Sequence, residues 1–215
     1  MSLFETQSNL NFPMSLAEKY RPRALSDFVG LEKIKRTLSK FAQQPYPSAW
    51  LAVGPSGCGK TSVGLALCET MHAELHKIPS QQCNIAAVEE VIRICHYVPQ
   101  FGGMHFVLVD EADKMSAAAA LHFLSKLDAT GFPPQTVFYF SCNSTEGLEP
   151  RFLSRTRQLE FSSYGMAGEA SQLLAKIWEC EAGDAPAPNF PQIVRDCRNN
   201  LRDCLMSLET EILAA

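Results

Sequence analysis

The residues that decide the fold are Gly54-Pro55-Ser56-Gly57-Cys58-Gly59-Lys60-Thr61, which match the G-x-x-x-x-G-K-[ST] pattern of a phosphate-binding loop. An apolar run, 50–53, precedes them, and residues 61–71 have the periodicity of a helix. The glycines allow backbone N–H groups to turn inward around phosphates, and the N-terminus of the following helix favours negative charge. Lys60 is expected to neutralise the β- and γ-phosphates, and Thr61 to offer its hydroxyl to Mg²⁺. The loop therefore predicts nucleoside triphosphate binding through Gly54, Pro55, Ser56, Gly57, Cys58, Gly59, Lys60, Thr61 and Ser62.

Polar residues follow two further apolar runs. Asp110 and Glu111 come directly after 106–109, where a buried strand would end. Asp110 is expected to hold Mg²⁺ through its water shell, and Glu111 to polarise an attacking water as general base. Asn143 follows the apolar run 136–141 and can hydrogen-bond the same water, although an asparagine there is also a common turn former. Together these residues predict hydrolysis, with water as the nucleophile.

Apolar runs alternate with helical patterns along the first three quarters of the chain. Strands are expected at 50–53, 75–78, 105–109 and 136–141, and helices at 31–41, 61–71, 85–97 and 116–127. This alternation predicts an α/β fold with a mostly parallel sheet covered on both faces. After residue 161 only helical patterns remain, at 166–180 and 193–213, separated by a proline-rich loop at 183–191. We therefore expect a loose tail at 1–15, an α/β core at 16–162 and a helical lid domain at 163–215.

The composition excludes several classes of protein. The chain has 215 residues, 46% of them hydrophobic, and 19 Lys+Arg against 23 Asp+Glu give a net charge of −4, so general disorder is excluded. No apolar run is long enough to cross a membrane, and residues 1–16 lack the pattern of a secretory signal. None of the eight cysteines forms a C-x-x-C pair, which disfavours a zinc ribbon and favours free thiols in a reducing compartment. A cytoplasmic or nucleoid-associated protein is expected.

The motifs and their order resemble an AAA+ ATPase of the clamp-loader type, similar to the small subunits of replication factor C. The resemblance is carried by the opening segment 17–23 (AEKYRPR) with 28–30, by 110–113 (DEAD), and by 141–143, 149–150 and 154–155. It implies a P-loop core with a five-stranded parallel sheet, ATP and Mg²⁺ as ligands, and Tyr20, Arg21 and Pro22 against the adenine. It also implies that the partners are other AAA+ subunits, DNA and a sliding clamp.

Two arginines receive roles from the resemblance alone. Arg155 would be an arginine finger that reaches the nucleotide of a neighbouring subunit, with Arg151 and Arg157 as rivals. Arg202 would be a second sensor that touches the γ-phosphate from the lid. The chain departs from the family pattern at Thr156, where cysteine is usual, and at Asn199, where glycine is common. It also reaches residue 215 without a collar domain, which makes ring assembly by this chain alone doubtful.

The sequence is compatible with other functions as well. The opening segment also resembles branch-migration and replication-restart ATPases, and a non-hydrolysing scaffold that binds ATP is a different class of answer. By analogy of fold, the helix at 85–97 and the basic run at 33–40 are candidate DNA-facing elements. The basic clusters are also compatible with solvated helix faces.

Overall fold

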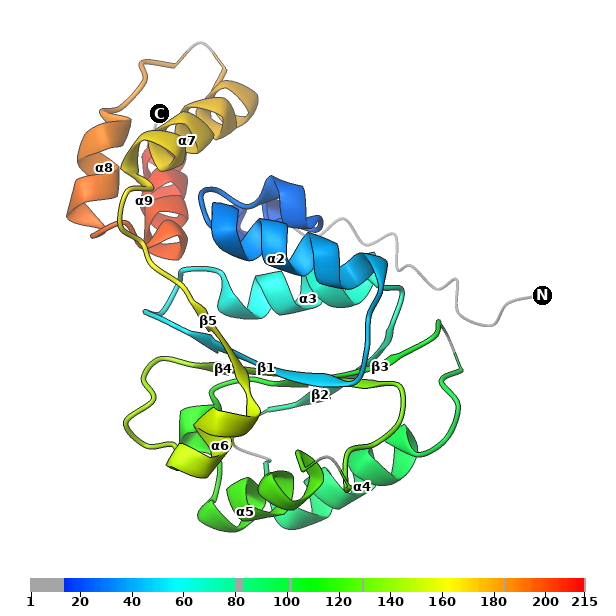
Figure 1. Cartoon of the computed structure of the whole chain (residues 1–215). Coiled ribbons are helices and arrows are strands. Elements are labelled where there is room, and N and C mark those ends of the chain that lie inside the picture. The colour runs from blue at the N-terminus through cyan, green and yellow to red at the C-terminus, as the bar shows by residue number, and fades with distance from the viewer. Residues whose placement is uncertain (1–13, 80–82, 101, 129, 184, 215) are drawn as a thin grey trace.

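The computed structural model describes residues 14–79, 83–100, 102–128, 130–183 and 185–214 (Figure 1). Its centre is a five-stranded sheet in the order β2-β3-β4-β1-β5, in which every pairing is parallel. The strands are β1 (Ser48–Val53), β2 (Glu74–Ile78), β3 (His105–Val109), β4 (Thr136–Cys142) and β5 (Arg157–Glu160). The predicted α/β class, the parallel sheet and the five strands are confirmed.

Helices cover both faces of the sheet. Figure 1 shows α2 (Glu32–Gln43) and α3 (Lys60–Thr70) on one face, and α4 (Ile85–Cys95), α5 (Ala117–Lys126) and α6 (Pro150–Arg155) on the other. Because side chains alternate along a strand, β4 serves both cores: Tyr139 packs with the α2–α3 side, and Phe138 and Phe140 pack with Phe123 of α5. This burial on both faces explains why β3 and β4 consist almost entirely of apolar residues.

The parallel arrangement brings three chain segments to one edge of the sheet. The phosphate-binding loop follows β1, Asp110 follows β3, and Asn143 follows β4, which pairs with both β1 and β3. In open α/β sheets, ligands bind outside the carboxyl ends of such strands. The topology therefore gathers the polar residues that the sequence separates by many positions.

The C-terminal helices pack into a core of their own. These helices are α7 (Ala167–Glu181), α8 (Phe190–Asp196) and α9 (Leu201–Ala214), and Leu16 of α1 (Leu16–Lys19) joins their apolar cluster. The prediction of one helix at 193–213 was wrong: Arg198 and Asn199 have left-handed backbone angles, with φ of 52° and 60°, and the helix is interrupted there. The loop predicted at 183–191 is also shorter, because Phe190 and Pro191 begin α8.

Some elements were not predicted, and each has a physical reason. The strand β5 lies at the sheet edge and buries only Leu159, so its sequence has no apolar run. The helix α6 has six residues and begins at Pro150, too short for a clear period. Of the predicted tail at 1–15, residues 1–13 lie outside the described residues.

Two further sequence expectations concern membranes and thiols. None of the helices within the described residues has the length and hydropathy of a membrane span. All eight cysteines are free thiols, six of them buried.

Candidate functional site

A cavity of about 420 Å³ opens at the carboxyl edge of the sheet. Its walls come from the opening segment, the phosphate-binding loop, the ends of β3 and β4, and helices α7 and α9. Gly54, Pro55 and Arg155 are outside its lining. The predicted site residues that do line it are Tyr20, Arg21, Pro22, Ser56, Gly57, Cys58, Gly59, Lys60, Thr61, Ser62, Asp110, Glu111, Asn143 and Arg202.

The backbone angles of the loop favour glycine at Gly57 and Gly59. Gly57 and Gly59 have φ of 75° and 91°, in the left-handed region that favours glycine, and Gly59 is the N-cap of α3. A Cβ atom on Gly57 would lie 1.8 Å from Oδ1 of Asn200, so the lid packs directly over the loop at this point. The glycine thus permits both the turn and the close approach of the lid.

Lys60 lies across the loop and is largely buried. Its Nζ donates hydrogen bonds to the carbonyl oxygens of Gly54 at 2.7 Å and Pro55 at 2.8 Å, and to Oδ1 of Asn143 at 3.0 Å. All three acceptors are neutral oxygens. A buried cation beside a loop of turned backbone is complementary to an anionic ligand, so the residues present fit a phosphate group.

Side-chain oxygens of Thr61, Asp110 and Ser141 meet beside the loop. Thr61 Oγ1 donates to Oδ1 of Asp110 at 2.8 Å, and Ser141 Oγ donates to the same carboxylate oxygen. The backbone N–H of Glu111 in turn donates to Ser141 Oγ at 3.2 Å. A hydroxyl and a carboxylate in contact are hard oxygen donors of the kind that Mg²⁺ prefers, so this pair fits the predicted ion.

Ser141 was not among the predicted site residues. In the sequence, Ser141 is marked only by its hydroxyl near the end of a mostly apolar strand, β4. In the structure the residue is 1% exposed. Its bonds to Asp110 and to the N–H of Glu111 give it a part in orienting both acids.

Glu111 lines the cavity beside Asp110. Its backbone is left-handed, with φ of 51°, and its Oε2 accepts a hydrogen bond from Lys114 Nζ at 2.9 Å. This hydrogen bond, together with the charge of Glu111, raises the pKa of Lys114. The carboxylate is therefore held at the cavity rim by a residue only three positions further along the chain.

The lid lines the cavity with one charged side chain and several apolar ones. Asn200 Oδ1 accepts hydrogen bonds from the backbone N–H groups of Arg202 and Asp203 at 3.1 and 3.4 Å and so caps the start of α9. Arg202, in the first turn of that helix, lines the cavity. The apolar lid residues that face the same cavity are Leu173, Leu201 and Leu205.

Tyr20 connects the opening segment to the lid. Its hydroxyl donates a hydrogen bond to Oε1 of Glu181, which also pairs with Lys19. That bond, with burial and the charge of Glu181, raises the pKa of Tyr20 to about 12. The phenol is thus neutral at physiological pH and fixes one wall of the cavity against α7.

Arg155 lies at the last position of α6, and its side chain is held there. Its Nε donates to Oδ1 of Asp128 at 2.7 Å, and its Nη1 donates to the carbonyl oxygen of Arg151 at 3.0 Å. Arg157, a rival in the sequence, instead lies over the rings of Tyr46 and Trp50. Within this chain, therefore, neither arginine joins the residues that line the cavity.

Comparisons with known proteins agree with this architecture. The chain is 28% identical over 203 residues to a replication factor C large subunit of Methanosarcina mazei, covering 90% of this chain and 33% of that protein. It is 26% identical over 213 residues to replication factor C subunit 3 of Blastobotrys adeninivorans, covering 95% and 62%. It is 30% identical over 153 residues to a replication factor C small subunit of Sulfurisphaera tokodaii, covering 67% and 46%. The chain thus spans between one third and about three fifths of the length of these relatives.

A solved structure shares the fold. The RuvB Holliday junction branch migration motor of Thermotoga maritima superposes with a TM-score of 0.71 at 17% identity, over 88% of this chain and 64% of that one. The model of the AAA family, ATPases associated with various cellular activities, matches residues 50–164, which is more than half of the chain. The chain therefore belongs to the AAA family of ATPases.

Proposed function

We propose that this chain hydrolyses ATP with Mg²⁺ as one subunit of a clamp-loader-like assembly that acts on DNA. The observation that carries the proposal is the shared cavity: the phosphate-binding loop, the Thr61–Asp110 pair, Asn143 and the lid residue Arg202 all face it. A cavity lined both by these groups and by apolar lid residues suits a nucleotide, whose phosphates are charged and whose base is flat and apolar.

The proposed roles follow from the contacts. Lys60 would exchange its bonds to the loop carbonyls for bonds to phosphate oxygens, and its bond to Asn143 places it beside the residue that would orient the water. Thr61 and Asp110 would hold Mg²⁺, which when bound neutralises charge on the β- and γ-phosphates. Glu111 would take the proton of the attacking water, a step that typically contributes ~10²–10⁴-fold in rate.

The lid would report the state of the nucleotide. Residues 163–215 are proposed as the lid domain and 16–162 as the core. Arg202 would contact the γ-phosphate from α9. The base would lie against Tyr20, Arg21 and Pro22. The hydrogen bond between Tyr20 and Glu181 would couple the position of the base to α7. Loss of the γ-phosphate would then alter the angle between lid and core.

Arg155 would act between subunits. The hydrogen bond to Asp128 holds the Arg155 side chain at the end of α6, outside the cavity of its own chain. A residue that contacts the nucleotide of a neighbouring subunit must lie outside its own cavity in this way. Such a finger is worth ~10³–10⁵ in rate in GTPase systems. The proposal therefore includes further AAA+ subunits as partners.

The relatives favour a clamp-loader assembly over the alternatives. The matched relatives are replication factor C subunits, whereas the RuvB likeness, at 17% identity, supports the fold only. By the same analogy we propose DNA and a sliding clamp as partners, with α4 and the basic run 33–40 as DNA-facing elements. A non-hydrolysing scaffold is disfavoured because Lys60, Asp110, Glu111 and Asn143 are all present.

The test is ATP turnover by the chain assembled with candidate partner subunits, measured with and without primed DNA and a sliding clamp. The proposal expects turnover to rise with primed DNA and to rise further with the clamp. A matched sample with blunt duplex DNA of the same length should stimulate less. Turnover that is indifferent to all of these additions would refute the clamp-loader part of the proposal.

A further inference from the structure

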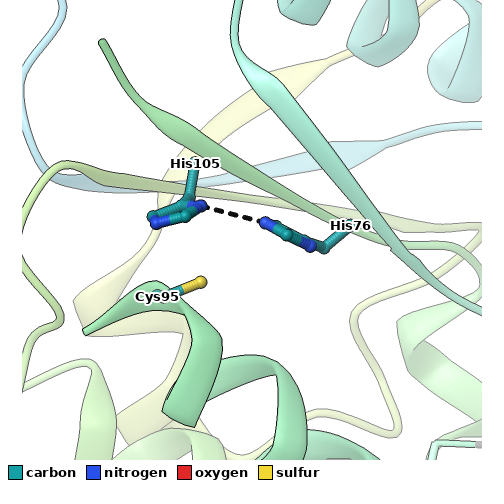
Figure 2. Close-up of side chains that lie close together, drawn as sticks. All are labelled: His76, Cys95 and His105. Carbon is teal, nitrogen blue, oxygen red and sulfur yellow. Dashed lines mark hydrogen bonds between the residues drawn. The ribbon is translucent and has the colours of Figure 1, made fainter. Parts of the chain in front are cut away.

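Three side chains of metal-binding types, two histidines and a cysteine, meet at the far end of the sheet from the nucleotide cavity. His76 comes from β2, His105 from the first position of β3, and Cys95 from the last turn of α4. One ligand atom of each lies within 4.8 Å of the other two. Figure 2 shows the two imidazole rings joined by a hydrogen bond and the sulfur of Cys95 directed toward them.

The hydrogen bonds orient His105 as a metal-binding histidine is oriented. Its Nε2 lies 3.0 Å from the carbonyl oxygen of Tyr97, which can only accept, so Nε2 carries the proton. Its Nδ1, 3.0 Å from Nε2 of His76, therefore presents a lone pair to the cluster. A ligating histidine almost always donates its second N–H to a carbonyl or carboxylate in this way.

A carboxylate stands beside the three side chains. Glu74 Oε1 lies 4.0 Å from His76 Nε2, and Glu74 Oε2 lies 3.9 Å from His105 Nδ1. The backbone N–H of Gln100 donates to Oε2 at 2.7 Å and fixes its direction. Glu74 is thus within a small side-chain movement of a fourth ligand position.

We propose that His76, Cys95 and His105, with Glu74 as the fourth ligand, bind a zinc ion. Two imidazole nitrogens, one thiolate and one carboxylate oxygen form a set that suits a tetrahedral site. On binding, the thiol of Cys95 releases its proton to solvent, and the proton on Nε2 of His76 moves to Nδ1 so that both ring nitrogens facing the ion are free. His105 keeps its N–H bond to Tyr97.

Burial gives the site a structural role. The side chain of His105 is 1% exposed and that of His76 is 11% exposed, so four protein ligands would close the site. The ion would tie β2, β3 and the end of α4 together. His105 and Asp110 stand at opposite ends of β3, roughly 16 Å apart at the rise of a strand, so the zinc site is separate from the nucleotide cavity.

The spacing of these residues along the chain does not match a known metal-binding motif, so the sequence alone does not indicate the site. The four side chains come from three elements between residues 74 and 105, with no C-x-x-C pair among them. Without the fold, Cys95 is a small apolar residue of α4, and the two histidines are unremarkable.

The experiment is a cobalt titration of the full chain, without a histidine tag, after removal of bound metals with a chelator. Co²⁺ reports tetrahedral geometry in the visible and a thiolate ligand in the near ultraviolet. We expect one ion per chain, a thiolate-to-cobalt band, and displacement of Co²⁺ by Zn²⁺. Cys95→Ser should lose the band, and Cys204→Ser, which removes another buried thiol, should keep it.

His76→Ala is the second test variant, with His96→Ala, which removes an exposed histidine, as its control. We expect at least tenfold weaker zinc affinity for His76→Ala and unchanged affinity for His96→Ala. Zinc should also raise the thermal unfolding midpoint of the wild type and of the two controls but not of Cys95→Ser. Far-ultraviolet circular dichroism confirms that each variant is folded.

Two results would overturn the proposal. One is a wild type that binds less than one ion per chain or shows no thiolate band, which would leave a hydrogen-bonded histidine pair only. The other is a thiolate band that survives in Cys95→Ser or disappears equally in Cys204→Ser. Neither result depends on ATP turnover, so the zinc site and the proposed ATPase function are tested separately.

Discussion

The contact between Gly57 and Asn200 predicts a measurable coupling between the phosphate-binding loop and the lid. In Gly57→Ala the added Cβ would lie 1.8 Å from Asn200 Oδ1, so the amide must rotate away. That oxygen caps α9 through Arg202 and Asp203, and the cap is lost when it moves. The substitution therefore perturbs two elements that are more than a hundred residues apart.

The size of the effect follows from two contributions. A non-glycine residue in the left-handed region costs about 1–2 kcal/mol, and Gly57 has φ of 75°. The loss of an asparagine cap costs about 1 kcal/mol. Gly57→Ala should thus lower the free energy of unfolding by about 2–3 kcal/mol. Asn200→Ala should cost about 1 kcal/mol in the wild type but almost nothing in Gly57→Ala, where the cap is already lost.

The assay is urea unfolding of the four proteins of this double-mutant cycle, followed by circular dichroism. Gly59→Ala is the matched control, because it has φ of 91° but its Cβ would meet Phe28 at an ordinary 3.5 Å. With Gly59→Ala, the cost of Asn200→Ala should stay at about 1 kcal/mol. Equal costs of Asn200→Ala in the wild type and in Gly57→Ala would refute the contact between loop and lid.

Three further predictions concern single side chains. Tyr20→Phe should lower the urea midpoint at pH 7, because the hydrogen bond to Glu181 is lost. Folding raises the pKa of Tyr20 from 10.0 to about 12, so the tyrosine contributes this stability below pH 10. The difference in urea midpoint between the wild type and Tyr20→Phe should therefore persist below pH 10 and vanish as the pH rises through about 12. Arg155→Ala should change the free energy of unfolding by less than about 1 kcal/mol but lower ATP turnover of the assembled subunits by on the order of 10³. Ser141→Ala should raise the Mg²⁺ concentration for half-maximal turnover by about tenfold, because Asp110 loses an orienting bond.

Each of these has a contrary outcome that is easy to recognise. A Tyr20→Phe difference that is constant up to pH 12 would show that the hydroxyl bond does not stabilise the fold. Weaker nucleotide binding in Arg155→Ala, measured on the isolated chain, would place that residue at its own cavity. An unchanged Mg²⁺ requirement in Ser141→Ala would remove Ser141 from the site.

The core of the fold could be predicted because its residues follow simple patterns. The strands β1, β3 and β4 are apolar on both faces. The phosphate-binding loop follows β1, and a polar residue of the site, Asp110 or Asn143, follows each of the other two. The edge strand β5 and the short helix α6 have no such pattern, because only Leu159 of β5 is buried and α6 is barely longer than a turn. The break between α8 and α9 depends on two left-handed residues, Arg198 and Asn199, which local periodicity does not reveal.

The residues of the site likewise fall into those that the sequence predicts and those that only the fold brings together. Lys60, Asp110 and Glu111 could be predicted from the sequence because their motifs are local, and all three line the cavity. Ser141 and Asn200 were not predicted. The contact of Ser141 with Asp110 depends on how the strands pair, and the position of Asn200 next to Gly57 depends on how the lid packs on the loop. The proposed zinc ligands were not predicted for the same reason, since three elements must meet before these side chains form a cluster.

Glu111 is proposed as the general base for hydrolysis of ATP held in the cavity. The most direct test of this role compares ATP turnover and ATP binding for the wild type, Glu111→Gln and the control Glu146→Gln, which changes an exposed glutamate, each assembled with partner subunits and primed DNA. We predict that Glu111→Gln retains ATP binding and loses turnover by ~10²–10⁴-fold, whereas Glu146→Gln behaves as the wild type. Equal turnover in Glu111→Gln and the wild type, or a wild type without turnover in this assembly, would contradict the account.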